Sequence, residues 1–407
     1  MTAAASAVNR LRGPAMPEAL AGGVLSMLAL VVYLLTGPTD AGSDSFVPLA
    51  QAFLDGRLSI PDDRPWLELV PAPDGGQYSP FPPVPAVLLM PLVAAANLVG
   101  AGEPAPNAYT AVAGAANVAL VFWLLGRIGV AFVPRQLLTV GFAFTTHWWV
   151  AGMAGTHLWA QTVAVTFTLL ALHLAVGRRW PLAAGLLLGL AAGSRLPMGL
   201  ALPLLLAMYA PRWRPTRAHL AVLAGVALMA LPIAAYNVAR FGSPLDFGYA
   251  RIPSGEFGLV TDEPWFRHGL ISPLYVPRHL YAILLQSFEW VDAAPFLRPS
   301  ITGLSLTLSA PFLFLAARAW SVRDRQPLVG VAVLSVGLIL LPDLMHGSWG
   351  FAQFGYRFVL DAVPVLMLLL GWAYRDRASP WLVSAIALGV AVHAYGIYAI
   401  NVLEFVA

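Results

Sequence analysis

The stretch ALAGGVLSMLALVVYLLTGPT, residues 19 to 39, holds 21 consecutive uncharged residues and decides how the rest of the chain is interpreted. A helix of this length covers the ~30 Å hydrocarbon core of a bilayer. Arg10 and Arg12 precede the run, and no convincing small-x-small cleavage site precedes Asp40. A signal peptide would share the positive charge and the apolar run, but it would be shorter and carry that site. We therefore expect an uncleaved first span with its N-terminus in the cytoplasm.

Further charge-free runs follow throughout the 407 residues, which are 59% hydrophobic and only 11% charged. This composition predicts an all-α polytopic membrane protein with about eleven transmembrane helices. The candidate spans lie at about 19–39, 104–126, 136–152, 156–177, 180–194, 196–211, 218–239, 299–317, 326–342, 358–374 and 380–403. We expect residues 1–407 to form one transmembrane domain, with no separate soluble domain.

Arginine clusters separate these spans at every second break, at residues 127/135, 178/179, 212/214/217, 318/323/325 and 375/377. The positive-inside rule predicts that all of them are cytoplasmic. All clusters can lie on the cytoplasmic side only if an additional apolar window, residues 75–102, does not cross the membrane. Its prolines at 80, 82, 83, 85 and 91 remove backbone donors and break regular helix, so we expect a re-entrant or in-plane segment.

Two long polar segments, about 40–80 and 240–298, then lie outside and hold most of the carboxylates. The polar chemistry is therefore expected at the extracytoplasmic surface. All 23 basic residues are arginine, the net charge is only +3, and the arginines form no stripe or tail, which argues against a nucleic-acid partner. The chain has no cysteine, so disulfides are excluded.

The segment SDSFVPLAQAFLDG, residues 43–56, has helical periodicity, because Phe46, Leu49, Ala50, Phe53 and Leu54 fall on one face. It predicts a short amphipathic helix that can lie on the membrane surface. Two interpretations of the carboxylate at its start stay open. Asp44, or Ser43, can cap the helix, or Asp44, with Asp40 as its rival, can act as a general base at the lipid–water boundary.

Four motifs occur in a recognisable order: DSFVPLAQAFLDGRL, GQYSPFPPVPAVLLMPL, RFGSPLDFGYA and GFAQFGYRFVLDAVPVLMLLL. In this order the chain resembles bacterial membrane glycosyltransferases of the GT-C superfamily, akin to the dolichyl-phosphate-mannose protein mannosyltransferases. The resemblance spans residues 20–375. It implies a GT-C-like fold and transfer of a sugar from a polyprenyl-phosphate carrier to an acceptor on the outer face of the bacterial inner membrane. It also implies an aspartate in the first outer loop as the catalytic base, which is Asp44 or Asp40 here.

The sequence departs from this family in two places. Many relatives carry a basic residue before the Pro-Pro of the second motif, where this chain has Ser79 and Phe81 flanking Pro80. A phosphate contact at that position is therefore in doubt. The large C-terminal soluble domain of some relatives has no counterpart before Ala407.

A lipid phosphate that leaves at the membrane boundary needs positive charge, and arginine is the only permanent cation of this chain. The candidates are Arg357, Arg240, Arg251, Arg195 and Arg278. Each also has a structural interpretation. Arg357 can form an internal ion pair with Asp361 four residues later, Arg195 can be a turn residue, and Arg240 and Arg251 can be solvated loop residues.

Aromatic and polar residues accompany these arginines. We expect His346, Trp349, Gln353 and Tyr356 to line a cavity above Arg357, although aromatic residues there also fit an interfacial belt. Tyr78 completes the predicted donor-binding set. The segment 276–290 predicts a second surface helix with Leu280, Ile283, Leu284 and Phe288 on one face, as a lid or as a plain anchor.

No motif supports a divalent metal or another cofactor, because the histidines show neither HxH nor HxxxH spacing. The predicted partners are the polyprenyl-phosphate sugar donor, membrane lipid, and a glycan, lipid or protein acceptor that the sequence does not name. The alternative function is a multi-spanning transporter or flippase of lipid-linked or small polar substrates. Transporters place ionisable groups near the membrane midplane, whereas these spans are almost free of charge at their centres. A non-catalytic scaffold with the same fold is a third interpretation.

Overall fold

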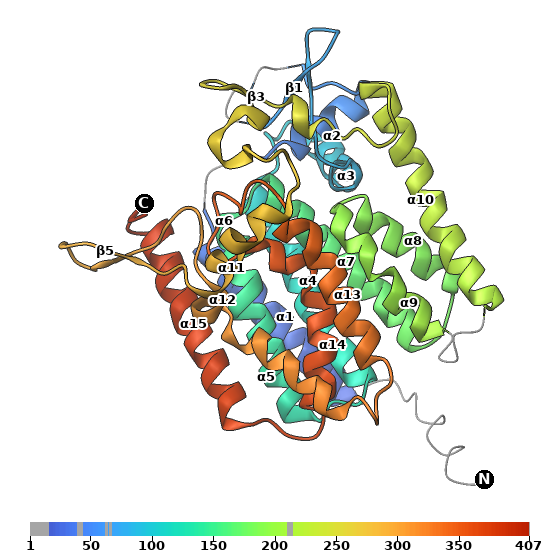
Figure 1. The fold of residues 1–407 in the computed structure, drawn as a ribbon, viewed down its shortest axis with the longest axis vertical. Coiled ribbons are helices and arrows are strands. Elements are labelled where there is room, and N and C mark those ends of the chain that lie inside the picture. Colours follow the sequence, from blue (N-terminus) through green and yellow to red (C-terminus); the bar gives the residue numbers. More distant parts are fainter. Residues whose placement is uncertain (1–15, 39–43, 62–63, 65–66, 210–214, 407) are drawn as a thin grey trace.

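The computed structural model of the chain describes residues 16–38, 44–61, 64, 67–209 and 215–406. These residues are mostly helical (Figure 1). Among the described residues, four helices are long and apolar enough to cross a membrane: α4 (Pro106–Arg127), α7 (Thr156–Val176), α10 (Arg217–Phe241) and α15 (Pro380–Asn401). The predicted count of eleven spans stays a prediction.

The other predicted spans also correspond to helical segments, most of them shorter. They are α1 (Met16–Thr36), α5 (Phe132–Phe142) with a π-helical turn η1 (Ala143–His147) and α6 (Trp148–Met153), α8 (Pro181–Ala192), η2 (Leu196–Ala201) with α9 (Leu202–Tyr209), α12 (Leu306–Ser309) with η7 (Pro311–Val322), α13 (Val329–Leu344), and η8 (Arg357–Asp361) with α14 (Val363–Ala373). Apolar side chains such as Leu20, Leu231 and Trp381 are exposed on α1, α10 and α15. Helices that face lipid have such surfaces.

The connections between these helices add short elements. Three antiparallel hairpins consist of β1 (Val70–Pro71) with β2 (Gln77–Tyr78), β3 (Pro253–Ser254) with β4 (Gly258–Leu259), and β5 (Glu289–Trp290) with β6 (Leu297–Arg298). Single 3-10 turns lie at η3 (Tyr249–Arg251), η4 (Val260–Asp262), η5 (Pro264–Phe266) and η6 (Pro273–Tyr275).

The arginine clusters that the structure describes lie at one end of the helices. Arg127 contacts His173 at 3.3 Å, five residues before the 178/179 cluster. Arg178 in turn donates to the Met208 carbonyl near the end of α9. At the same end, the amide of Ala131 donates to the Arg375 carbonyl, and Arg318 lies over the ring of Tyr374. Arg10, Arg12, Arg212 and Arg214 lie outside the described residues. The grouping fits one cytoplasmic face, and the orientation in the membrane stays a prediction.

Near the opposite end, α2 (Phe46–Leu54) packs on α3 (Val84–Leu98) beside β1 and β3 (Figure 1). The amphipathic helix predicted for residues 43–56 is thus present. Its apolar face is covered by protein rather than lipid, because Phe46 and Leu49 are fully buried in a cluster with Phe81, Leu89 and Trp159. This cluster fixes the first outer loop onto α7.

Two expectations for local structure need correction. The prolines of 75–102 do not prevent a regular helix: Pro83 and Pro85 stand at the start of α3, where amides need no helical partner, and only Pro91 is internal. With 15 residues α3 is still too short to span ~30 Å, which keeps the in-plane prediction open. The second surface helix ends early, because α11 covers only Val276–Leu284 and a strand begins at Glu289.

Candidate functional site

Asp44, the predicted base, lies directly before α2 and is only 6% exposed. Its Oδ1 accepts from the Phe46 amide at 3.0 Å, and Oδ2 accepts from the Val47 amide at 3.0 Å and the Tyr109 hydroxyl at 2.7 Å. Burial raises the pKa of Asp44, and the three hydrogen bonds oppose this effect, while the charge of Glu103 adds to it. Asp44 therefore binds free amides at the start of the helix, although the N-cap position itself is Ser45 and not Asp44.

The surroundings of Asp44 tie it to the N-terminal ends of α4 and α7. The amide of Ser45 donates to Thr156 Oγ1 at 2.8 Å, and the Tyr109 ring meets Trp159 edge to face at 4.8 Å. The start of the first outer loop therefore lies against the N-terminus of α7. The rival base Asp40 lies outside the described residues, as does Ser43.

Glu68 of the same loop contacts His157 of α7, with 3.3 Å between Oε2 and Nε2. Protein surrounds the Glu68 carboxylate, yet 55% of its side-chain surface is open to water. Burial raises its pKa, but His157 and the charges of Arg357 and His346 outweigh burial and lower the pKa to about 2. Glu68 is thus an ionised, accessible carboxylate beside the predicted site.

No sequence pattern singles out Glu68 or His157 as a pair. Glu68 lies in an irregular stretch without periodicity, and His157 is 89 positions away. Only the packing of the loop on α7 joins them, with the Phe81 ring edge to face against His157 at 5.0 Å. A carboxylate in an outer loop and a histidine at the start of a span were the available signals.

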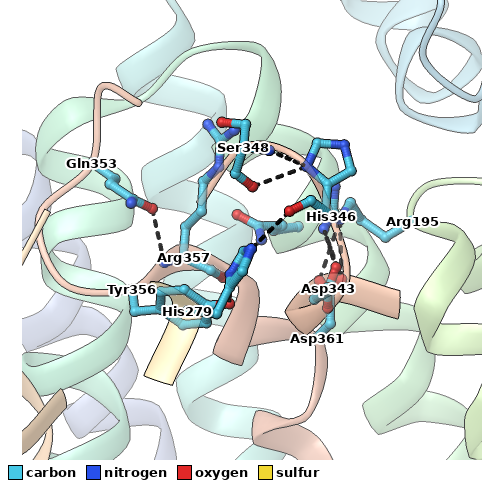
Figure 2. Close-up of polar contacts among 10 residues, drawn as sticks. Arg195, His279, Asp343, His346, Ser348, Gln353, Tyr356, Arg357 and Asp361 are labelled. Atoms are coloured by element: carbon cyan, nitrogen blue, oxygen red, sulfur yellow. Dashed lines mark hydrogen bonds and ion pairs between the residues drawn. The ribbon is translucent and has the colours of Figure 1, made fainter. Parts of the chain in front are cut away.

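Arg195 follows α8 and reaches two buried carboxylates (Figure 2). Its Nη2 lies 2.9 Å from Asp361 Oδ2 and 3.6 Å from Asp343 Oδ1. Its Nε also donates to both oxygens of Asp361, at 3.3 and 3.1 Å. Arg195 is therefore no plain turn residue, because it neutralises carboxylates that α13 and η8 bury.

Arg357 is 7% exposed and does not form the ion pair with Asp361 that its spacing suggested. Within the described part of the chain its guanidinium makes one hydrogen bond, from Nη1 to the Phe351 carbonyl at 3.1 Å, and no ion pair within 4.0 Å. The guanidiniums of Arg357 and Arg195 lie 5.3 and 5.6 Å from the ring centre of Phe358. Two cations thus converge on one aromatic ring, and only Arg195 has carboxylate partners.

Gln353 and Tyr356 are each 1% exposed and shape the loop rather than line an open cavity. Gln353 Oε1 accepts from the Arg357 amide at 2.9 Å, which holds the backbone of that arginine. Tyr356 donates its hydroxyl hydrogen to His279 Nδ1 at 2.7 Å, because His279 Nε2 must donate to the His346 carbonyl at 2.8 Å. Burial lowers the pKa of His279 to about 4, in keeping with this neutral ring.

His346 keeps partial exposure, and its Nδ1 contacts both the amide and the carbonyl of Ser348 at 3.1 and 2.9 Å (Figure 2). Its ring also meets Phe358 at 5.9 Å, the ring that both arginines approach. His346 therefore lies beside the ring that both cations approach, and its role in donor binding stays a prediction.

Arg240, Arg251 and Tyr78 form a second group around Phe241. Arg240 donates to the Ser79 carbonyl and stacks over Tyr236 at 3.7 Å, and Arg251 pairs with Asp246 at 2.9 Å on the surface. Tyr78 meets Phe241 edge to face at 5.6 Å. These three predicted donor contacts have protein partners that hold the second outer loop. They are not joined to Arg357 in one constellation.

In the ranges that the structure describes, no three histidine, aspartate or glutamate side chains gather in a way that could hold a metal ion. Glu68 and His157 contact each other, but they have the positive charge of Arg357 close by rather than a third ligand.

Comparisons of the chain with protein-family models, with curated protein sequences and with solved structures give no significant match. The residues themselves must therefore carry any functional argument.

Proposed function

We propose that this chain is a membrane glycosyltransferase. It would move a sugar from a polyprenyl-phosphate-linked donor to an acceptor on the extracytoplasmic side of a bacterial inner membrane. The observation that carries the proposal is the buried Arg357 guanidinium, which lies beneath the first outer loop and has a single neutral carbonyl as its hydrogen-bond partner in the described residues.

A buried cation without a carboxylate partner is costly, because taking one ion out of water costs several kcal/mol unless an opposite charge compensates. Glu68 acts on Arg357 only over a longer distance, and Asp361 is already bound to Arg195. An anionic ligand would supply the missing charge. A lipid phosphate is such a ligand, and the fork of the guanidinium matches phosphate oxygens in a bidentate way.

The reaction that fits is a displacement at the anomeric carbon. An acceptor hydroxyl attacks that carbon, the bond between it and the phosphate oxygen breaks, and the polyprenyl phosphate leaves with the bonding electrons. Arg357 stabilises the charge that grows on the leaving phosphate. The proton of the acceptor hydroxyl moves to a carboxylate of the first outer loop.

Two described carboxylates can take that proton. Asp44 is the base that the family resemblance implies, and within the described residues Oδ1 accepts from one donor, so it retains acceptor capacity. Glu68 is more open to water, and the charge of Arg357 acts on it. The low pKa of Glu68 makes it a weak base, however. We assign the base role to Asp44 and a role in orienting the acceptor to Glu68 with His157.

The alternative of a transporter or flippase requires ionisable groups in the middle of spans. Asp343 is the penultimate residue of α13, Arg195 follows α8, and Arg357 begins η8. Buried charge at helix ends beneath outer loops supports the transferase over the transporter.

Incubation of the purified protein with polyprenyl-phosphate sugars, followed by mass spectrometry of the released lipid phosphate, tests the proposal. We expect release from the parent and at least tenfold less from Arg357→Gln, while Arg323→Gln, which removes an exposed arginine outside the predicted site, stays within a few-fold. Equal release from the parent and Arg357→Gln would reject the role of Arg357. Transport of the intact lipid-linked sugar without cleavage would favour the alternative function.

A further inference from the structure

A pocket of about 420 Å³ lies beside α11, apart from the ion pairs described above. Its wall includes Arg278, Tyr281, Gln286, Ser300, Thr302 and Trp349. The volume falls in the range of small-molecule sites, which also combine aromatic surface with a few fixed polar groups. No step of the proposed reaction uses this pocket.

The polar side of the pocket is a connected row of side chains. Gln286 Nε2 donates to Thr302 Oγ1 at 2.8 Å and to the Gly303 carbonyl at 3.0 Å, and the hydroxyls of Ser300 and Thr302 lie 2.8 Å apart. Gln286 Oε1 accepts no hydrogen bond from the described residues. The row therefore presents fixed hydroxyl and amide groups that can exchange hydrogen bonds with the hydroxyls of a ligand.

The other side is aromatic. The Arg278 guanidinium lies over the Trp349 ring, 4.6 Å from the ring centre, and Tyr281 is 57% exposed. Arg278 also lies over Tyr275 and donates to the Trp265 and Gly347 carbonyls, so most of its capacity is used. An aromatic face attracts the slightly positive C–H groups of a pyranose ring, which is flat on that side.

Charge in the pocket argues for an uncharged ligand. Glu289, which also contributes to the wall, forms an ion pair of 2.7 Å with Arg298. Arg278 has no carboxylate partner among the described residues, but unlike Arg357 it is partly exposed, so water screens its charge. Hydroxyls and amides remain as the available polar groups. A neutral sugar matches them better than a phosphate or a carboxylate does.

One side chain joins this pocket to Arg357. Gln353 Nε2 donates to the carbonyls of Thr302 and Trp349, at 2.8 and 3.0 Å, and Gln353 Oε1 accepts from the Arg357 amide. A ligand in the pocket would therefore lie one side chain away from the proposed phosphate site.

We infer that this pocket binds a neutral pyranose unit of the acceptor. The acceptor role rests on the proposed function, whereas the binding of a pyranose does not. The acceptor would then be a glycan or a glycolipid, with its sugar stacked on Tyr281 or Trp349 and its hydroxyls bonded to the row of Ser300, Thr302 and Gln286.

Saturation-transfer NMR on the full chain in detergent tests this inference, with methyl α-mannopyranoside and methyl β-glucopyranoside as probes and glycerol as the open-chain reference. We expect transfer to at least one pyranoside that exceeds transfer to glycerol. Tyr281→Ala and Thr302→Val should each reduce it about fivefold. Trp320→Ala is the matched control, because it removes another exposed tryptophan that carries an arginine, Arg323 at 5.1 Å, and it should leave the signal unchanged.

The inference is overturned if neither pyranoside exceeds glycerol, if both pocket variants keep the full signal, or if Trp320→Ala lowers the signal equally. Melting curves identify variants that have unfolded. The two pocket substitutions lie on different walls, so one folded variant is enough for the test. No lipid donor is present in this experiment. Pyranoside binding without any lipid-phosphate binding at Arg357 would therefore reject the proposed transferase and keep the pocket. Lipid-phosphate binding at Arg357 without pyranoside binding would reject the pocket and keep the transferase.

Discussion

Arg195 and Asp361, 166 positions apart in the chain, form a buried ion pair with 2.9 Å between Nη2 and Oδ2. The contact joins the residue after α8 to the end of η8. It takes away the carboxylate that Arg357 was expected to neutralise, so Arg357 is left with a carbonyl in the described structure. We place the proposed phosphate site at Arg357 because Arg195, and not Arg357, pairs with Asp361.

The ion pair itself should contribute strongly to stability. Asp361→Asn leaves the mostly buried Arg195 with only the weaker contact to Asp343, and breaking such a pair typically costs about 3–5 kcal/mol. We expect a melting temperature several degrees lower in detergent. Asp246→Asn, which breaks the exposed pair with Arg251, should cost at most about 1 kcal/mol. Equal melting temperatures for the two variants would show that the buried pair is not structural.

Substitutions at Asp44 separate capping from catalysis. Asp44→Asn keeps one acceptor oxygen for the helix amides but cannot take a proton, so we expect a stability loss of about 1 kcal/mol and ~100- to 10,000-fold slower transfer. The matched control is Tyr109→Phe, which removes a donor to Asp44 and leaves its carboxylate. It should have a similar effect on stability and little effect on rate.

The same pair of measurements can reject the assignment. Transfer by Asp44→Asn within a few-fold of the parent excludes Asp44 as the base. Asp40→Asn should be milder than Asp44→Asn, and an inactive Asp40→Asn beside an active Asp44→Asn would assign the role to Asp40. An inactive Glu68→Gln with an active Asp44→Asn would instead assign it to Glu68.

The lowered pKa of Glu68, beside His157 and near Arg357, predicts a pH dependence of stability. Folding lowers the pKa of Glu68 from its usual 4.5 to about 2, so the unfolded chain binds the proton more readily. The stability that this carboxylate contributes is complete above pH 4.5 and is lost as the pH falls toward 2. Melting curves of the parent and Glu68→Gln should converge over this window. Glu256→Gln, at an exposed position in the β3–β4 turn, should follow the parent at every pH.

Topology can be tested because the chain has no cysteine. Ala101 and Ala131 are exposed and lie at opposite ends of α4, after α3 and before α5 respectively. If residues 75–102 do not cross the membrane, an impermeant thiol reagent added to cells should label a cysteine at 101 and not at 131. Labelling at 131 and not at 101 would contradict the in-plane assignment.

Much of the fold could be predicted because lipid imposes simple rules on sequence. The span predicted at 156–177 is α7, Thr156–Val176, since an uninterrupted apolar run without charge can only be satisfied as helix. The helix after Asp44 was also predictable from its periodicity. The ends of segments that mix proline with apolar residues were less so: the span at 299–317 is a short helix followed by the 3-10 segment Pro311–Val322.

The site was predicted only in part, for physical reasons. Arg357 and Asp361 would share one face of an α-helix, but residues 357–361 form a 3-10 turn, in which positions four apart point about a third of a turn away from each other. The partners of Asp361 and Glu68 are distant in sequence, and no local pattern marks them. The roles of Arg240 and Tyr78 depend on how the second outer loop folds back on Phe241.

Binding of a polyprenyl phosphate to Arg357 tests the central claim most directly. Native mass spectrometry of the detergent-solubilised protein with undecaprenyl phosphate, and with phosphatidylglycerol as the competing anionic lipid, gives the affinity without any transfer reaction. We predict selective binding of the polyprenyl phosphate, weakened about tenfold or more in folded Arg357→Gln and unchanged in Arg323→Gln. Equal binding by the parent and Arg357→Gln, with normal melting curves for both, would contradict the account.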